Sequence, residues 1–265
     1  MSGTPSRVDL SSARAKLARA HEHLEDAKAI TDRLVNLDRY KFGSKSDKHK
    51  AGWFSVVVEK AEPIPERFGI LIGDAAHNLR SALDHIAFAF AKPLSLEKEK
   101  DVFFPLFKER GDWTRRTRKC LPGVSSQVRA EIQRLQPYHG ERWSDTKLLG
   151  KLQAVDNWDK HRRLLVSVIG MASAKFSLAF DKPVTVIDQK FYIRREIKIG
   201  AVIARFRITQ DFRDVGVYVQ SGLVLGPILD KRMPANLRNT PILGLLKVCA
   251  DKIGDEIIPR FETFL

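Results

Sequence analysis

Apolar positions in the first 160 residues recur mainly at the spacing of helices. Apolar residues from 17 to 37, preceded by capping candidates at Asp9, Ser11 and Ser12, predict a long helix that ends near residue 40. The segment 69–91 predicts a second helix, because its apolar side chains form one continuous stripe on a helical wheel. Two further helices are expected over 125–136 and roughly 145–162, separated by a turn around Pro137 and Gly140.

The pattern changes after residue 162. Short β-branched runs, broken by Gly, Pro and Asp, continue to about residue 225 and predict an antiparallel sheet. Strict alternation over 201–209 predicts one buried and one wet face. Val202, Ala204, Phe206 and Ile208 fall on the first face, and Arg205 and Arg207 on the second. A short strand over 53–59 precedes this region, and a last helix over about 241–262 follows it.

Together these patterns predict an α+β fold in a single domain of residues 1–265. A helical bundle of about five helices would carry an antiparallel β-sheet inserted before the C-terminal helix. Residues 1–162 would be mainly helical, 163–225 would form the sheet, and 240–264 would return to the bundle. With 43% apolar residues, the chain can bury a sizeable core.

Charge adds a candidate partner. The chain has 46 Lys and Arg against 32 Asp and Glu, a net charge of +14, which fits RNA or another polyanion and equally fits a basic surface that serves solubility. Basic residues cluster in two stretches of the sequence, residues 41–52 and residues 101–123. The first is rich in glycine and serine and the second is irregular, so we expect both to be loops. Arg115 and Arg116 could hold phosphates there, with Trp113 free to stack on a base; solvated loops are the alternative.

Other classes of protein receive little support. Cys120 and Cys249 are too few for a disulfide framework or a thiolate zinc site. The first residues lack the apolar core of a signal peptide, and no run approaches about 18 consecutive apolar residues. We therefore expect a cytoplasmic protein with no membrane contact, no cofactor and no metal ion.

The predicted helix over 69–91 has an unusual polar face. Instead of long Lys and Glu side chains, the face carries short or titratable groups with poorer helix propensity. These are Asp74, His77, Ser81, Asp84 and His85. A second polar segment, DNWDKHRR at 156–163, ends another predicted helix. The two segments together indicate a candidate site.

Carboxylates at the end of a helix are disfavoured by its dipole, so Asp156 and Asp159 need compensation. They could pair with Lys160 and Arg163 at i,i+4, or with Arg80 from the other helix in a shared cleft. Three interpretations follow: a buried polar network that locks two helices together, a catalytic or binding site, or a metal site. The metal site would use Asp74, His77, His85 and His161. The metal site is the weakest interpretation. His77 and His85 are eight positions apart on a helix, about 12 Å along its axis, which is too far for both to bind one ion.

Two phrases resemble the signatures of a broad group of uncharacterised bacterial proteins. They are GDAAHNLRSALDH at 73–85 and LQAVDNWDKHRRL at 152–164. In that group, a G-D-x-x-H-N-L-R-S-A-L-D helix is followed by an N-x-D-K-H-R helix end and a β-rich tail. The resemblance spans about residues 50–225 and implies no particular activity.

RSALDH at 80–85 also resembles, more remotely, the HEPN superfamily of helical bundles, whose ribonuclease members carry Arg, four to six residues, then His. The resemblance implies a metal-independent ribonuclease or a related RNA-binding protein, with an active site built by a homodimer. Arg80 would stabilise phosphate charge and His85 would transfer a proton, with His77 or His161 as the second such group. The sequence departs from the pattern at Ser81, where a larger polar residue is usual, and in the early position of the helix.

The remaining residues of the candidate site would serve binding. They are Asn78, Asp84, Asp156, Asn157, Asp159, Lys160 and Arg162. A competing hypothesis comes from a different class: a non-catalytic interaction or structural module in which the Arg, Asp and His cluster is a buried polar network. The two hypotheses differ in whether Arg80 and His85 face solvent or are buried and hydrogen-bonded.

Overall fold

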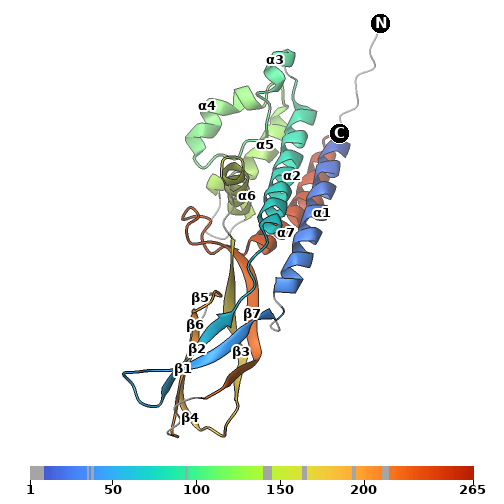
Figure 1. Ribbon diagram of the computed structural model, residues 1–265. Coiled ribbons are helices and arrows are strands. Elements are labelled where there is room, and N and C mark those ends of the chain that lie inside the picture. Colours follow the sequence, from blue (N-terminus) through green and yellow to red (C-terminus); the bar gives the residue numbers. More distant parts are fainter. Residues whose placement is uncertain are drawn as a thin grey trace. The chain divides into compact units, whose positions relative to one another are not determined.

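The protein is a mixture of helices and antiparallel strands (Figure 1). The computed structural model describes residues 9–34, 36, 39–92, 95–139, 145–162, 166–192, 195–210 and 215–265. The chain divides into two compact units. One comprises Met1–Ala27, Gly69–Leu164 and Lys231–Leu265, and the other Lys28–Phe68 and Leu165–Asp230. The first unit is helical, and the second holds the strands.

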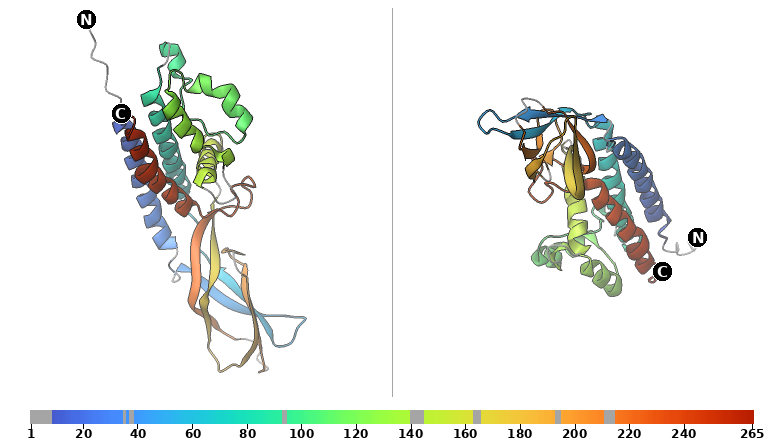
Figure 2. Two further views of the ribbon diagram at one scale, coloured as in Figure 1. Left: turned by 180° about the vertical axis from the view of Figure 1, so that it is seen from behind. Right: turned by 90° about the horizontal axis from the view of Figure 1, so that it is seen from below.

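Long helices form the frame of the helical unit. They are α1 (Ser11–Leu34), α2 (Glu66–Phe90) and a C-terminal helical run made of α7 (Ile242–Asp251), η3 (Lys252–Ile257) and α8 (Ile258–Glu262). The two further views show the C-terminal run lying along α1 and α2 (Figure 2). Arg14 of α1 forms an ion pair of 2.6 Å with Glu262 of α8. Within the described part of the chain, no helix is both long and apolar enough to cross a membrane.

The apolar stripe of α2 is buried as its spacing predicts. Five of its side chains have no exposed surface: Ile72, Ala76, Leu79, Leu83 and Ile86. Burying a leucine or isoleucine side chain contributes about 1.5–3 kcal/mol. The burial of this stripe therefore fixes the rotation of α2 and determines where its polar face points.

Shorter elements complete the helical unit. They are α3 (Leu96–Glu99), α4 (Arg110–Cys120), α5 (Ser126–Arg134), η2 (Pro137–His139) and α6 (Asp145–Asp159). Ser125 caps α5, its hydroxyl accepting a hydrogen bond from the Val128 backbone N–H. The expectation of a loop throughout 101–123 is wrong, because α4 lies inside it. Its buried stripe, Trp113, Thr117 and Cys120, has helical spacing but only one large apolar side chain, so the periodicity was weak.

The strand unit contains two antiparallel sheets rather than the one expected. The larger has the order β1 (Lys41–Ser46), β2 (Trp53–Lys60), β6 (Val202–Ile208) and β4 (Val186–Phe191). The smaller has the order β5 (Arg195–Glu196), β3 (Val166–Phe180) and β7 (Val217–Leu229). Residues 41–46, expected in a loop, form β1 and pair with β2. Residues 163–165, where the sheet was expected to begin, lie outside the described part.

The alternation in β6 is confirmed from Ala204 to Ile208, but it fails at the start of the strand, where Val202 is half-buried and Ile203 is buried. Ala204, Phe206 and Ile208 are buried, and Arg205 and Arg207 are exposed. The Phe206 ring stacks on Phe54 with centroids 5.4 Å apart and meets Phe180 edge-on at 5.1 Å. Because Phe180 belongs to β3, these aromatic contacts join the two sheets of the strand unit into one core.

Candidate functional site

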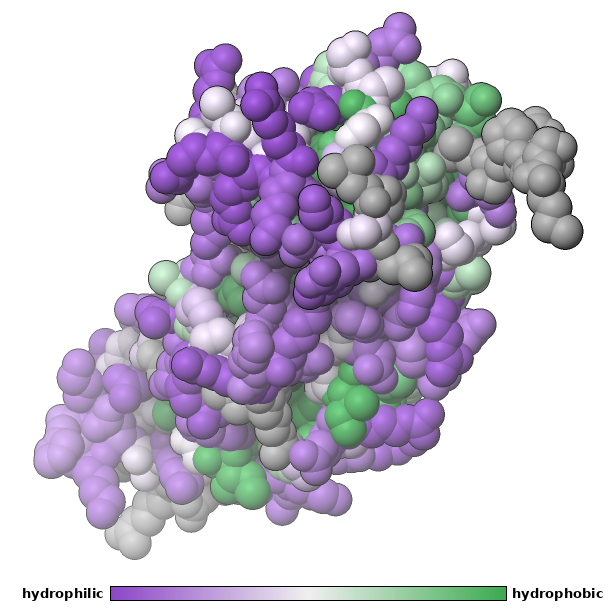
Figure 3. All heavy atoms as spheres, turned by 90° about the horizontal axis from the view of Figure 1, so that it is seen from above, coloured by the Kyte–Doolittle hydropathy of each residue, from purple (hydrophilic) through white to green (hydrophobic). Residues whose placement is uncertain are grey.

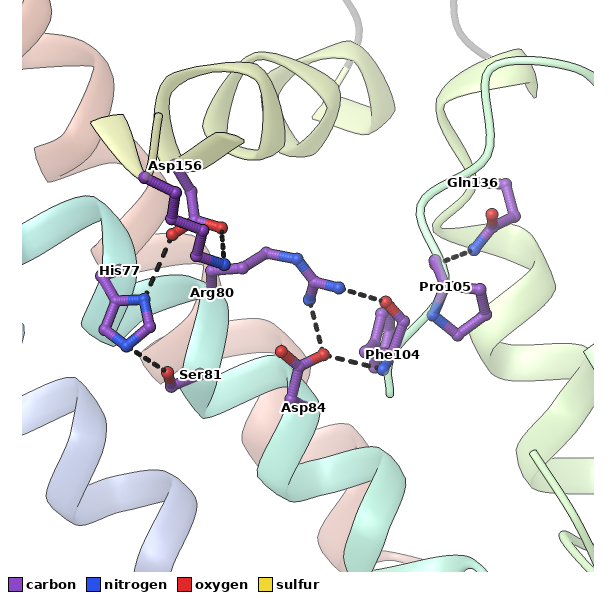
Figure 4. Close-up of polar contacts among 9 residues, drawn as sticks. His77, Arg80, Ser81, Asp84, Phe104, Pro105, Gln136 and Asp156 are labelled. Atoms are coloured by element: carbon purple, nitrogen blue, oxygen red, sulfur yellow. Dashed lines mark hydrogen bonds and ion pairs between the residues drawn. The ribbon is translucent and has the colours of Figure 1, made fainter. Parts of the chain in front are cut away.

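The polar face of α2 meets the end of α6 inside the helical unit (Figure 4). The approach is close at Gly73, where an added Cβ would collide with the Asp159 carboxylate. A glycine at this position of α2 therefore leaves room for that carboxylate against the helix backbone. Sequence reasoning placed Gly73 in a motif but gave it no role.

Asp156 is the centre of the first polar group. Its side chain is only 2% exposed, and its Oδ1 lies 3.2 Å from His77 Nδ1. Its Oδ2 accepts a hydrogen bond of 2.7 Å from Lys160 Nζ. The i,i+4 pairing of Asp156 with Lys160 is thus confirmed, whereas the alternative pairing of Asp159 with Arg163 lies outside the described residues. A buried carboxylate with two cationic or polar partners satisfies the usual requirement for a buried charge.

His77 is held at Nδ1 by a buried carboxylate and meets the Ser81 hydroxyl at Nε2. Its side chain is 52% exposed, so the ring stands at the surface while its partner is buried. A carboxylate at Nδ1 favours the tautomer in which Nδ1 carries the proton, leaving Nε2 as an acceptor. Nε2 lies 3.5 Å from the Ser81 hydroxyl, one helical turn further along α2. The arrangement can therefore take up a proton at Nε2 while Asp156 keeps the ring in place.

Arg80 belongs to a separate, structural group. The guanidinium is buried, and NH2 donates a hydrogen bond of 2.6 Å to the Phe104 carbonyl. NH1 lies 3.0 Å from Asp84 Oδ1, an ion-pair distance that lacks hydrogen-bond geometry. The same Oδ1 accepts the Phe104 backbone N–H at 2.9 Å. The alternative pairing, of Arg80 with Asp156 or Asp159, is wrong, because the guanidinium contacts Asp84 and the Phe104 carbonyl instead.

Gln136 continues this group on the other side of the same segment. It is fully buried, accepts the Phe107 N–H at 2.9 Å and donates to the Pro105 carbonyl at 2.7 Å. Figure 4 shows Arg80 and Gln136 contacting the segment from opposite sides. Arg80, Asp84 and Gln136 thus fix residues 104–107 between α2 and α5. Gln136 was not predicted as part of the site, and its only signal in the sequence is a polar residue at a helix end next to Pro137.

His85 does not join Arg80. Five helical residues separate them, which turns the two side chains about 140° apart around the axis of α2. His85 is half-buried, and among the described residues it forms no hydrogen bond or ion pair. The described part of the chain also brings together no three His, Cys, Asp or Glu side chains able to hold a metal ion.

Carboxylates dominate the electrostatics beside His77. Burial raises the pKa of Asp159, and the neighbouring charges of Asp74 and Asp156 raise it further, while His77 acts in the opposite direction. The pKa of Asp84 is also raised by burial, against the lowering effects of Arg80 and the Phe104 N–H. A carboxyl group with a raised pKa releases its proton less readily and can serve as a proton donor.

The remaining candidate residues near the end of α6 are exposed. Asn157 and His161 face solvent, and the Arg162 guanidinium lies 4.7 Å from the centre of the Trp158 ring. Asn78 of α2 donates a hydrogen bond of 2.9 Å from its side-chain amide to the backbone carbonyl of Asp74. Among the described residues, the polar partners of the His77 ring are Asp156 and Ser81.

Helix α4 presents basic side chains to solvent. Arg115 pairs with Asp112 at 2.7 Å, and Arg116 lies over the Phe107 ring at 5.0 Å. Arg118 lines a hollow of about 280 Å³ and has no ion pair within the described ranges. Trp113 is only 8% exposed, so its expected role in base stacking is wrong: its ring packs in the core beneath α4. Figure 3 shows that hydrophilic side chains cover most of the visible face.

Comparison with known proteins adds no family to this description. No protein-family model matches the chain, and neither a curated protein nor a solved structure matches it at a significant level.

Proposed function

We propose that the protein binds RNA and cleaves it without a metal ion, with His77 as the group that accepts the proton. The observation that carries the proposal is the half-exposed His77 ring, held at Nδ1 by the buried carboxylate of Asp156. A carboxylate that orients an imidazole and stabilises its protonated form is a recurrent device of proton-transfer catalysis. The proposal keeps the ribonuclease chemistry of the HEPN resemblance but assigns its base to His77.

The reaction needs one base and one acid. His77 Nε2 would take the proton of a ribose 2′-hydroxyl as that oxygen attacks the adjacent phosphorus. The bond from phosphorus to the 5′-oxygen would break, leaving a 2′,3′-cyclic phosphate and a 5′-hydroxyl. Asp159, whose pKa is raised by burial and by the neighbouring carboxylates, is one candidate to return a proton to the leaving oxygen. His161, exposed at the end of α6, is the alternative donor.

Substrate charge would be met by the basic side chains of the helical unit. Lys160 Nζ is bound to Asp156, but 45% of its side chain is exposed. Arg115, Arg116 and Arg118 of α4 are exposed as well. Contacts between such cations and phosphates give affinity that is independent of sequence and falls with added salt. Arg80 and His85 take no part in the chemical step of this proposal. The role of Arg80 is to position residues 104–107.

A second candidate is a non-catalytic protein that binds a polyanion. The specific observation in its favour is the acidic surrounding of His77, since Asp74, Asp156 and Asp159 would repel a phosphate. In that case the His77 and Asp156 pair would serve only to join α2 and α6. The two candidates differ in cleavage, while both require RNA binding.

Incubation with single-stranded and structured RNA in EDTA tests the proposal. Wild type should produce fragments that end in a cyclic phosphate, and His77→Ala should reduce the rate by at least about 100-fold, the typical contribution of general base catalysis. His85→Ala and His21→Ala, the latter an exposed histidine of α1, serve as matched controls and should cleave like wild type.

Binding and melting are recorded for every variant. Equal RNA affinity and equal melting temperature would show that His77→Ala removes chemistry rather than structure. Absence of cleavage by wild type, together with salt-dependent RNA binding, would overturn the catalytic proposal in favour of the second candidate. Loss of cleavage by His85→Ala with intact cleavage by His77→Ala would move the base to His85.

A further inference from the structure

A second hollow lies in the helical unit, between α5 and the C-terminal helical run. Its volume is about 450 Å³, and its apolar lining comes from Leu135, Ile257 and Phe261. Phe261 and Ile257 are buried and form the floor beneath the hollow, whereas Leu135 is partly exposed. Small-molecule sites usually measure about 300–1,000 Å³ and are lined by apolar and aromatic groups with a few polar ones.

One buried carboxylate holds two arginines at this hollow. The side chain of Glu131 is 9% exposed; its Oε1 lies 2.5 Å from Arg260 Nε and its Oε2 3.4 Å from Arg134 NH1. The arginine side chains are themselves 52% and 64% exposed. A guanidinium has five N–H donors, so each arginine has donors left after contacting Glu131. Glu131 therefore gathers two partly unused guanidinium groups at one place.

The charges that line the hollow are unequal in number. Lys252, whose side chain is 9% exposed, pairs with Glu256 at 2.8 Å. Three cations, Arg134, Lys252 and Arg260, thus stand against two carboxylates, Glu131 and Glu256. The excess of one positive charge favours a ligand with a single negative charge.

A π-helical turn shapes the wall. Pro259 has no backbone N–H, and in a regular α-helix its ring would clash with the carbonyl four residues earlier. The six residues before α8, Lys252–Ile257, instead form the π-helix η3. Three residues of this turn line the hollow. Such turns are rare in helices and are frequently found at functional sites.

We propose that this hollow binds a small organic monoanion that combines one flat apolar ring with one carboxylate. The ring would pack on Leu135 and on the aliphatic stems of Arg134 and Arg260, and the carboxylate would receive N–H donors from the same two arginines. A compact inorganic anion would use the charges but leave Leu135 and the arginine stems uncovered. The inference is independent of RNA cleavage, since none of the hollow's residues belongs to the His77 group.

Calorimetric titration of the full chain tests this proposal. The probes are benzoate and indole-3-carboxylate, with benzamide as the neutral match and sodium chloride at equal ionic strength as the blank. One carboxylate should bind per chain, and benzamide should bind at least about tenfold more weakly, equivalent to about 1.4 kcal/mol. Failure of both carboxylates to bind at millimolar concentration, or equal binding of benzamide, would overturn the proposal.

Three variants locate the binding. Arg134→Ala removes one donor while Arg260 still neutralises Glu131, so the fold is retained and affinity should fall about tenfold. Leu135→Trp fills the hollow and should abolish binding without removing a charge. Arg118→Ala, an exposed arginine of α4, is the control and should bind like wild type. Wild-type affinity in both Arg134→Ala and Leu135→Trp would place the ligand elsewhere and refute the assignment.

Discussion

Replacement of Arg80 separates a structural from a catalytic role for this residue. Arg80→Ala removes the donor to the Phe104 carbonyl and the cationic partner of Asp84. Loss of a hydrogen bond from a charged group costs about 1.5–3 kcal/mol, and removal of one partner from a buried ion pair about 3–5 kcal/mol. Because the Asp84 side chain is 35% exposed, water can solvate part of its charge, and the lower range applies. We expect the free energy of unfolding to fall by about 1.5–3 kcal/mol.

Urea unfolding followed by tryptophan fluorescence measures this loss. Asp84→Asn and the double variant complete a cycle, and the coupling between Arg80 and Asp84 should be at least about 0.5 kcal/mol for residues in direct contact. Arg80→Lys should recover only part of the stability, since lysine cannot reproduce the two-pronged contact. A stability loss below about 0.5 kcal/mol in Arg80→Ala, combined with abolished RNA cleavage, would refute the structural role and return Arg80 to the catalytic group.

Three further predictions concern buried groups. Gln136→Leu should lower the free energy of unfolding by about 2–4 kcal/mol in urea melts, because the Phe107 N–H and the Pro105 carbonyl lose their partner inside the protein; an unchanged stability would contradict its anchoring role. Burial and neighbouring carboxylates raise the pKa of Asp159 above its ordinary value of 3.8, so its ionisation makes the folded state less stable as pH rises through the window above 3.8. Asp159→Asn should remove that fall in thermal melts and raise the melting temperature at pH 7. Burial raises the pKa of Cys120 to about 11 and that of Cys249 to about 12, so mass spectrometry should find neither alkylated by iodoacetamide at pH 8 until the protein unfolds.

Periodicity in the sequence predicted the elements whose burial is one-sided. The stripe of α2 and residues 204–208 of β6 each repeat apolar residues at a regular interval, and these residues are buried as expected. Helix α4 was not predicted, because two of its buried positions hold Thr117 and Cys120 rather than large apolar residues. Strand β1 was not predicted, because its sequence KFGSKS has no apolar alternation. The strand depends on pairing with β2 for its structure.

The sequence predicted which two polar segments meet in the candidate site, but it did not predict which side chains pair with one another. The polar face of α2 and the segment after Asp156 do meet, and Asp156 does bind Lys160. Which carboxylate each cation contacts depends on the packing of α2 against α6 and on residues 104–107, and no local pattern encodes that. Arg80 therefore reached Asp84 and Phe104 instead of the carboxylates of α6. Gln136 could not be foreseen, because its partners are backbone groups about 30 residues away.

Wild type and His77→Ala are compared on two matched oligonucleotides in EDTA to test whether His77 accepts the 2′-hydroxyl proton. One is RNA throughout, and the other carries a 2′-O-methyl group at every ribose, which removes the proton that His77 would accept. The account predicts cyclic-phosphate products only from wild type acting on the unmodified RNA. Equal cleavage of that RNA by His77→Ala, or cleavage of the methylated strand by wild type, would contradict it.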